Sequence, residues 1–146
     1  MLTSVIRNRI PFTVIGIFTV IVGALCAAQL MQAAAAPPGH DRVVFATTLP
    51  NVPGKTITAV KVDYPPGVSS PAHRHAGSVF AYVLSGEIRS ENSATGPARV
   101  YHAGEAFFEP PGSAHLVSEN ASASEPASLL AVFVADDDAK LTVPAR

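Results

Sequence analysis

Two histidines, His73 and His75, are separated by a single residue within the stretch 67–86. Turn-forming residues surround them, and the apolar, β-prone run 79–84 follows. Side chains alternate across a β-strand, so both imidazoles would lie on the same face of a strand. Neutral imidazole is a ligand for zinc, iron, nickel and copper. The pattern predicts half of a metal site, and the rest of the chain must provide the other half.

Strand patterns recur along the chain, separated by turns rich in proline and glycine. No segment after residue 37 has the helical period of 3.6 together with capping residues. Short strands with turn signals every 8–12 residues or so are typical of an all-β sandwich or barrel. The expected strands cover residues 43–45, 55–64, 79–89, 99–102, 106–108, 115–118 and 129–134, and Gly86 interrupts the third of them.

Alternation within two of these strands predicts which side chains face inward. In the strand 55–64, Val60, Val62 and Tyr64 share one face, and we expect that face to be buried. In the strand 79–89, Phe80 and Tyr82 share a phase. Large aromatic side chains more often form core or pocket wall than specific contacts. Phe80, Tyr82 and Phe108 are therefore expected to line a pocket.

The first 36 residues differ from the rest of the 146-residue chain. Arg7 and Arg9 precede a stretch of 22 uncharged residues, 10–31, and a run of small residues, 33–36, follows it. A positive start, an apolar run and a small-residue exit predict a secretory signal peptide. An uncleaved anchor is the alternative, because 22 helical residues would span a hydrocarbon core of about 30 Å. Either way, we expect an exported protein, periplasmic or extracellular, which contacts a membrane only through residues 10–31.

Charge and cysteine content exclude several classes of protein. Without residues 1–36 the formal net charge falls from −1 to −3, because two arginines and no acids are lost. No basic cluster is present, so nucleic-acid binding has no support. The only cysteine, Cys26, lies within the apolar run. The exported part therefore has no disulfide, and its stability must come from a core or a metal.

Two motifs in residues 55–134 resemble those of the cupins. The first consists of Gly67, five residues, His73-x-His75 and then Gly86. The second consists of Gly104, five residues, Pro110-x-Gly112, two residues and His115, and 17 residues separate the two motifs. The resemblance implies an all-β cupin double-stranded β-helix, a jelly-roll barrel preceded by the apolar signal or anchor helix. It also implies that His73, His75 and His115 bind a divalent metal such as Fe, Mn, Zn or Ni.

The sequence departs from the cupin pattern at two places. The first motif usually has a glutamate four residues after its second histidine, where this chain has Val79. The second motif usually ends in asparagine where this chain has Glu119, and Asn120 comes one residue later. Glu109 is the best substitute for the missing glutamate, because it would otherwise be an isolated charge in an apolar stretch. We predict Glu109 as a fourth metal ligand or as a catalytic base.

Less specific roles remain open for each of these residues. His73 and His75 could be exposed loop histidines, and His115 could be a satisfied core histidine. Glu109 could be a carboxylate at the rim, paired with an arginine. The resemblance leads us to expect residues 37–54 as an N-terminal extension, 55–138 as the barrel and 139–146 as a tail.

Three functions follow from the resemblance. The first is a metal-dependent enzyme acting on a small organic substrate with dioxygenase-like chemistry. The second is a non-enzymatic module that binds a metal or a small ligand, and the third is a cupin that has lost its metal. The three histidines argue against the third function. Cupins often pair through edge strands, so a homodimer is also expected.

Overall fold

The computed structural model describes residues 40–145. The predicted signal or anchor segment, 1–36, lies outside these residues. Within residues 40–145, no helix is long and apolar enough to cross a membrane. The described residues form strands joined by turns, as the sequence pattern predicts. The strands are β1 (His40–Thr48), β2 (Lys55–Tyr64), β3 (Ser69–Ser70), β4 (His73–His75), β5 (Ser78–Ser85), β6 (Glu87–Asn92), β7 (Gly96–His102), β8 (Ala106–Glu109), β9 (Ala114–Asn120), β10 (Ala127–Asp136) and β11 (Thr142–Pro144).

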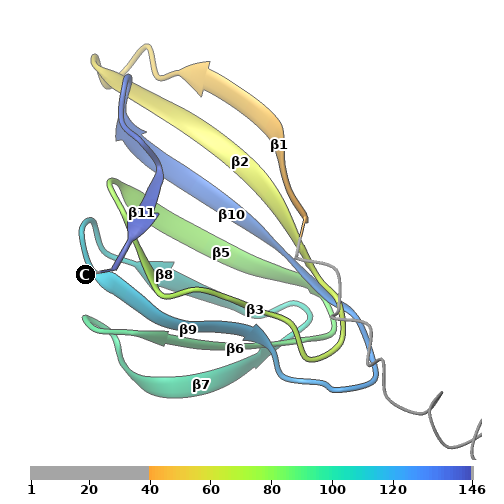
Figure 1. Ribbon diagram of the computed structural model, residues 1–146. Helices are drawn as coiled ribbons and strands as arrows, with labels where there is room; N and C mark the ends of the chain where they lie inside the picture. Colours follow the sequence, from red (N-terminus) through yellow and green to blue (C-terminus); the bar gives the residue numbers. More distant parts are fainter. Residues whose placement is uncertain (1–39, 146) are drawn as a thin grey trace, which may run out of the picture. The chain divides into compact units, whose positions relative to one another are not determined.

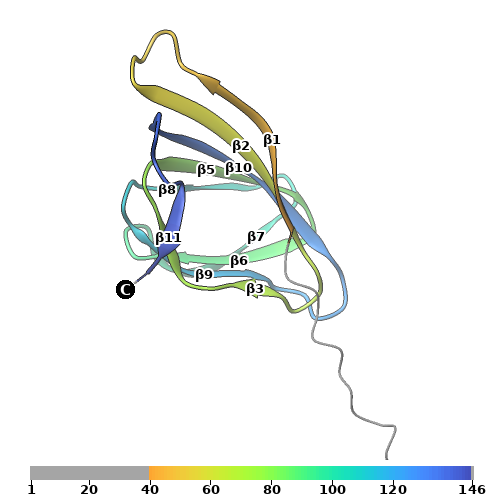
Figure 2. The ribbon, with the colours of Figure 1, turned by 45° about the horizontal axis from the view of Figure 1, so that its top comes forward.

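The strands form two antiparallel sheets that face each other (Figures 1 and 2). One sheet has the order β1-β2-β10-β5-β8, and the other has the order β11-β4-β9-β6-β7 with β3 paired to β9. Strands far apart in sequence are therefore neighbours, as β2 and β10 are. This is the two-sheet jelly-roll barrel expected from the sequence.

Gly86 is the point at which the chain leaves one sheet for the other. β5 before it belongs to the first sheet, and β6 after it belongs to the second. Its φ of 68° is in the left-handed region. A Cβ atom here would lie 2.5 Å from the carbonyl oxygen of Pro126, so only glycine fits. The strand expected over residues 79–89 is thus two strands joined by a sharp bend.

The interior lies between the two sheets. Val60 and Tyr64 on β2 are buried, as the alternation predicts, and Val62 packs beside them. Leu129 and Phe133 on β10 are buried too. Val79, Val83 and Ile88 are at most 1% exposed and form the most deeply buried part of the core.

The phase expected for β5 is wrong. Val79, Ala81 and Val83 face inward, opposite Phe133, Ala131 and Leu129 of β10. Every residue from 79 to 84 is apolar, so alternation gives no signal there, and the pairing with β10 decides the register. The bulkier residues of the alternate phase are turned to the outer face of the sheet.

The outer face carries an apolar row across all five strands. In register order the row consists of Phe45, Ala59, Val132, Phe80 and Phe108. Phe45, Phe80 and Phe108 are about half exposed, at 56%, 48% and 49%. The predicted homodimer remains a prediction.

The sheets extend beyond the expected barrel bounds at both ends. β1 pairs with β2 through eight residue pairs, and a bulge lies between Val43 and Phe45. β11 pairs with β4, so that Thr142 lies opposite His75. Residues 40–48 and 142–144 therefore contribute strands to the two sheets; the first of these includes the strand expected over 43–45, whereas no strand was expected at 142–144.

Candidate metal centre

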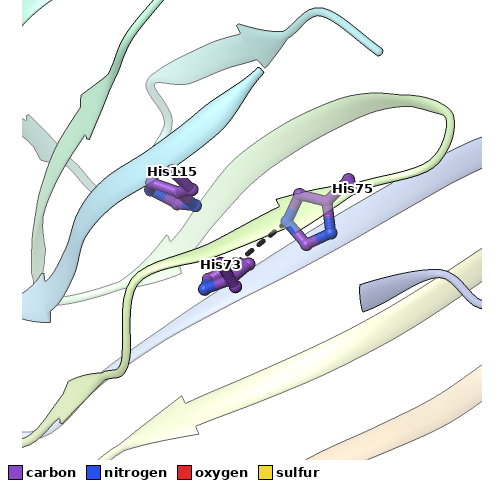
Figure 3. A group of neighbouring side chains, drawn as sticks. All are labelled: His73, His75 and His115. Atoms are coloured by element: carbon purple, nitrogen blue, oxygen red, sulfur yellow. Dashed lines mark hydrogen bonds between the residues drawn. The ribbon is translucent and has the colours of Figure 1, made fainter. Parts of the chain in front are cut away.

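Three histidines from two neighbouring strands come together at the inner face of the second sheet (Figure 3). His73 and His75 are on β4, and His115 on β9 is the direct partner of His73 in the strand pair. One potential ligand nitrogen of each ring lies within 4.8 Å of the other two. His75 and His115 are buried and His73 is half-buried. The spacing His73-x-His75 therefore places two imidazoles on one face, as predicted.

The ring nitrogens of His73 and His75 are oriented by backbone carbonyl groups. His73 Nδ1 is 2.7 Å from the carbonyl oxygen of Pro71, and His75 Nδ1 is 3.1 Å from that of Leu141. A carbonyl oxygen only accepts, so each Nδ1 carries the donated proton. In a neutral ring, Nε2 then carries a lone pair. The two Nε2 atoms lie only 3.0 Å apart (Figure 3), an arrangement that a shared cation would stabilise.

His115 has one satisfied and one unsatisfied nitrogen. Its Nε2 is 2.8 Å from Ser90 Oγ, and its Nδ1 is 3.1 Å from Glu109 Oε2. Nδ1 is buried and has no hydrogen-bond partner. Buried polar atoms normally have partners, so this nitrogen is available to a ligand. The alternative of a satisfied core histidine does not fit this environment.

Glu109 reaches the histidines from the opposite sheet. It is the last residue of β8 and pairs directly with Val79 of β5. Its Oε2 is 3.9 Å from His75 Nε2 and accepts a hydrogen bond from Asn92 Nδ2 at 3.1 Å. Glu109 is 3% exposed, so it is not a carboxylate at the rim. Burial raises the pKa of Glu109 to about 7, although the bond from Asn92 opposes the shift.

Burial also keeps two of the histidines uncharged near neutral pH. It lowers the pKa of His75 to about 4, with a further contribution from the nearby His73. It lowers the pKa of His115 to about 3, with contributions from His73 and His75. Neutral imidazole is the form that binds metals. His75 and His115 are therefore in the binding form near pH 7.

A cavity of about 460 Å³ opens beside the histidines. β2 and β10 contribute Val60, Val62, Tyr64, Leu129 and Phe133 to its wall, and the C-terminal residues 141–144 contribute further contacts. His73, His75, His115 and Glu109 all line it. Its volume is in the range of small-molecule sites.

Phe80, Tyr82 and Phe108 do not line this cavity, so the pocket predicted from them is corrected. Phe80 and Phe108 are half exposed, and Tyr82 is 39% exposed. All three lie on the outer face of the first sheet, because each is one strand position away from an inner residue, Ala81 or Phe107. The aromatic residues that do line the cavity are Tyr64, Phe107 and Phe133.

Sequence reasoning missed three polar residues of the site. Ser90 contacts His115, and Asn92 contacts Glu109. Both follow the buried Ile88 at intervals of two along β6, so alternation could have indicated them. Tyr64 was expected only as core, but its hydroxyl oxygen lies 2.8 Å from both Ser70 Oγ and Ser118 Oγ.

Asn120 has a structural role outside the histidine cluster. Its side-chain amide donates hydrogen bonds to the carbonyl oxygens of Tyr64, Pro65 and Glu125, and its Oδ1 accepts one from Ser122 N. These bonds hold the turn after β2 against the loop between β9 and β10. The neighbouring Glu119 pairs with Arg89 at the surface, at 3.2 Å.

The donor set fits a divalent transition metal. Three neutral imidazoles and one carboxylate are ligands that iron, manganese and zinc accept. The remaining nitrogen of each histidine meets a protein oxygen, from Pro71, Leu141 or Ser90, as is usual for metal-binding histidines. The cluster could therefore hold a metal at the wall of the cavity.

The comparison with protein families gives one match. The model of the cupin domain matches residues 60–133, which include all three histidines and Glu109. No curated protein matches the chain.

Solved structures resemble the chain over most of its length. An uncharacterised protein with a double-stranded β-helix domain from Klebsiella pneumoniae is 24% identical to this chain, with a TM-score of 0.59. The match covers 77% of this chain and 88% of that protein. A DMSP lyase from Ruegeria pomeroyi is 19% identical, with a TM-score of 0.59, and the match covers 82% of this chain and 57% of the lyase.

A Bacillus subtilis oxalate decarboxylase with Mn(II) centres is 29% identical to this chain, with a TM-score of 0.50. The match covers 60% of this chain and 23% of the decarboxylase. The chain thus spans less than two thirds of the length of the lyase and of the decarboxylase.

The family match covers half of the sequence, and the two-sheet barrel with its histidine cluster agrees with it. The chain belongs to the cupin family.

Proposed function

We propose that this protein is a metal-dependent enzyme that binds one divalent transition metal and acts on a small organic substrate, with oxygenase chemistry. His73, His75 and His115 hold the metal, and Glu109 completes the set. The observation that carries the proposal is the pair of Nε2 atoms only 3.0 Å apart beside the buried Nδ1 of His115, which forms no hydrogen bond and lies 3.1 Å from the Glu109 carboxylate. A cation would satisfy all three nitrogens at once.

The residues of the chain have separate tasks in this proposal. A bound metal would supply a Lewis acid that polarises a substrate oxygen. The carbonyl oxygens of Pro71 and Leu141 and the hydroxyl of Ser90 keep the rings turned toward the centre. Glu109, with a pKa of about 7 in the metal-free protein, can hold or accept a proton at its Oε2. The cavity beside the cluster binds the substrate.

Similar proteins support the assignment as an enzyme. Structures similar to this chain include a DMSP lyase, an oxalate oxidase and an oxalate decarboxylase with Mn(II) centres.

The test is elemental analysis of protein purified without added metal. We expect about one divalent ion per chain, and its loss in His75→Ala and in His115→Ala. His102→Ala is the matched control, because His102 on β7 is exposed and its ring Nδ1 lies 3.3 Å from Glu87 Oε1, outside the cluster. Equal metal content in all four proteins would refute the metal site. Oxygen uptake with a candidate substrate then tests the oxygenase part.

A non-enzymatic binding module is the second candidate. The chain covers 57% of the DMSP lyase, 46% of the oxalate oxidase and 23% of the oxalate decarboxylase, so much of each enzyme has no counterpart here. A redox-inert metal that raises the melting temperature without any turnover would favour this candidate.

Export remains part of the proposal. It rests on the two arginines and the uncharged run 10–31, which lie outside the described residues. Cell fractionation of the tagged full chain tests it, and recovery in the cytosol alone would refute it.

A further inference from the structure

The composition of the cavity wall points to the kind of molecule that it accepts. Most of the side chains that face the cavity are apolar, among them Val60, Val62, Phe107, Leu129 and Phe133. Two acidic side chains, Asp41 and Glu109, also line it. No lysine or arginine does so among the described residues. A bound anion would therefore find no positive side chain in the wall to neutralise it.

Two basic side chains that lie next to cavity residues in sequence are engaged elsewhere. Arg74 lies between the two β4 histidines in sequence, but its Nη1 donates to the carbonyl oxygen of Gly112 at 2.8 Å. Lys61 alternates with the inner residues Val60 and Val62 and forms an ion pair with Asp63. Neither reaches the cavity.

A metal would supply little positive charge to a second anionic group. A divalent ion among three neutral histidines and the Glu109 carboxylate has a net charge of about +1. A dianion would overcompensate that charge within an apolar wall and next to Asp41. Burying an uncompensated charge is costly, so such a ligand is disfavoured.

A hydroxyl cluster provides a polar contact away from the histidines. Tyr64 Oη lies 2.8 Å from Ser70 Oγ and 2.8 Å from Ser118 Oγ, and all three residues line the cavity. Three hydroxyl groups carry three protons, and the two bonds between them use two. One proton is left to donate to an acceptor, and Tyr64 itself is 4% exposed.

We propose that the cavity takes a largely apolar molecule with one end at the histidine cluster and an uncharged acceptor oxygen at the Tyr64–Ser70–Ser118 hydroxyls, and that it discriminates against ligands that carry a carboxylate away from the histidine end. The inference rests on the proposed function, since the histidine end requires the metal. It adds the substrate class, which the family does not specify.

Two probes of similar shape test the charge discrimination. The protein is loaded with Co²⁺, and its visible spectrum reports ligand binding at the metal. Methyl 3,4-dihydroxybenzoate is uncharged near neutral pH, and 3,4-dihydroxybenzoate carries a carboxylate at the same position. We expect the ester to bind at least about tenfold more tightly, which corresponds to 1.4 kcal/mol. Equal or tighter binding of the carboxylate would overturn the inference.

A gain-of-charge variant provides the reciprocal test. Val62 is half-buried and lines the cavity. Val62→Lys should shift the preference toward the carboxylate. Val62→Met introduces a side chain of length similar to lysine but without its charge, and it should leave the preference for the ester unchanged. Melting temperatures confirm that both variants fold. An unchanged preference in a folded Val62→Lys protein would contradict the role given to the wall.

The hydroxyl cluster is tested with Tyr64→Phe. Loss of one neutral hydrogen bond, worth about 1 kcal/mol, should weaken binding of the ester about fivefold. Binding of 4-ethylcatechol, which lacks the acceptor, should not change. An equal effect on both probes would refute the hydrogen-bonding role. If Co²⁺ itself fails to bind, the proposed function fails; if Co²⁺ binds and the ester does not, only the substrate class fails.

Discussion

Val79 and Glu109 lie directly opposite each other in the β5–β8 pair, and both side chains are buried on the inner face of the first sheet. Directly paired residues have Cβ atoms about 5 Å apart. A carboxylate on β8 can therefore reach the same part of the interior as one on β5. Glu109 reaches within 3.1 Å of His115 Nδ1, and this supports the proposal that it takes the place of the glutamate expected at position 79.

This relationship predicts that the carboxylate can be moved back. Glu109→Val should lower the affinity for a divalent metal by at least about tenfold, since it removes a ligand or an ordering contact. Adding Val79→Glu to that variant should recover much of the loss. Metal titration of both proteins checks the prediction, and their melting temperatures check the fold. A double variant that binds no better than Glu109→Val would show that position 79 does not reach the site.

Ser90 should position His115 without contacting the metal. Its hydroxyl is 2.8 Å from His115 Nε2, so Ser90→Ala frees the ring to rotate. Loss of such a supporting contact typically lowers metal affinity about 10–100-fold. Ser128→Ala is the control, because Ser128 is also buried but bonds to Ser85, at 2.8 Å. Similar affinities in the two variants would rule out the positioning role.

The stability of the metal-free protein should depend on pH through three buried groups. The folded-state pKa values of His75 and His115, about 4 and 3, lie below the ordinary value of 6.5. As pH falls below 6.5, the unfolded chain therefore binds more protons on these two histidines than the folded chain does. The free energy of unfolding decreases as a result. Glu109, with its pKa raised from 4.5 to about 7, acts in the opposite direction between those two values.

Removal of the carboxylate should expose the histidine contribution. In Glu109→Gln the free energy of unfolding should rise more steeply between about pH 4.5 and 6.5 than in the parent protein. At pH 8 the metal-free variant should be the more stable of the two, while its metal affinity is the lower. Denaturant titrations in the presence of a chelator measure both the slope with pH and the stability at pH 8. Parallel curves for the two proteins would contradict the burial of an ionisable Glu109.

Truncation in the core between the sheets and truncation on the outer face of the first sheet should have different effects on stability. Ile88 is completely buried, so Ile88→Ala should cost about 2–5 kcal/mol of unfolding free energy. Phe108 is half exposed and faces Phe80 on the outer surface, so Phe108→Ala should cost about 1 kcal/mol or less. Phe108→Ala should also leave metal affinity unchanged. A large loss of affinity in this variant would restore Phe108 to the site.

Much of the fold was predictable because its signals are local. The alternation in 55–64 identifies β2 and its inner face, and the turn residues separate most of the other strands. The spacing of His73 and His75 places both rings on one face of β4. The approach of His115 to them followed only from the resemblance to the cupins, since no local pattern links β9 to β4.

The remaining features depend on long-range pairing. The phase of β5 is set by its partner β10, and an all-apolar strand does not reveal it. The contact between Ser90 and His115 joins residues 25 apart in sequence. The change of sheet at Gly86 depends on the close approach of Pro126 and Ala127, which no local pattern indicates.

Nitrogen NMR of the imidazole rings during titration with Zn²⁺ tests the central claim most directly. The account predicts that one ring nitrogen in each of His73, His75 and His115 shifts and that the change saturates at about one equivalent of metal, while His102 is unaffected. Unchanged nitrogens in the three clustered histidines, or shifts confined to His102, would contradict it.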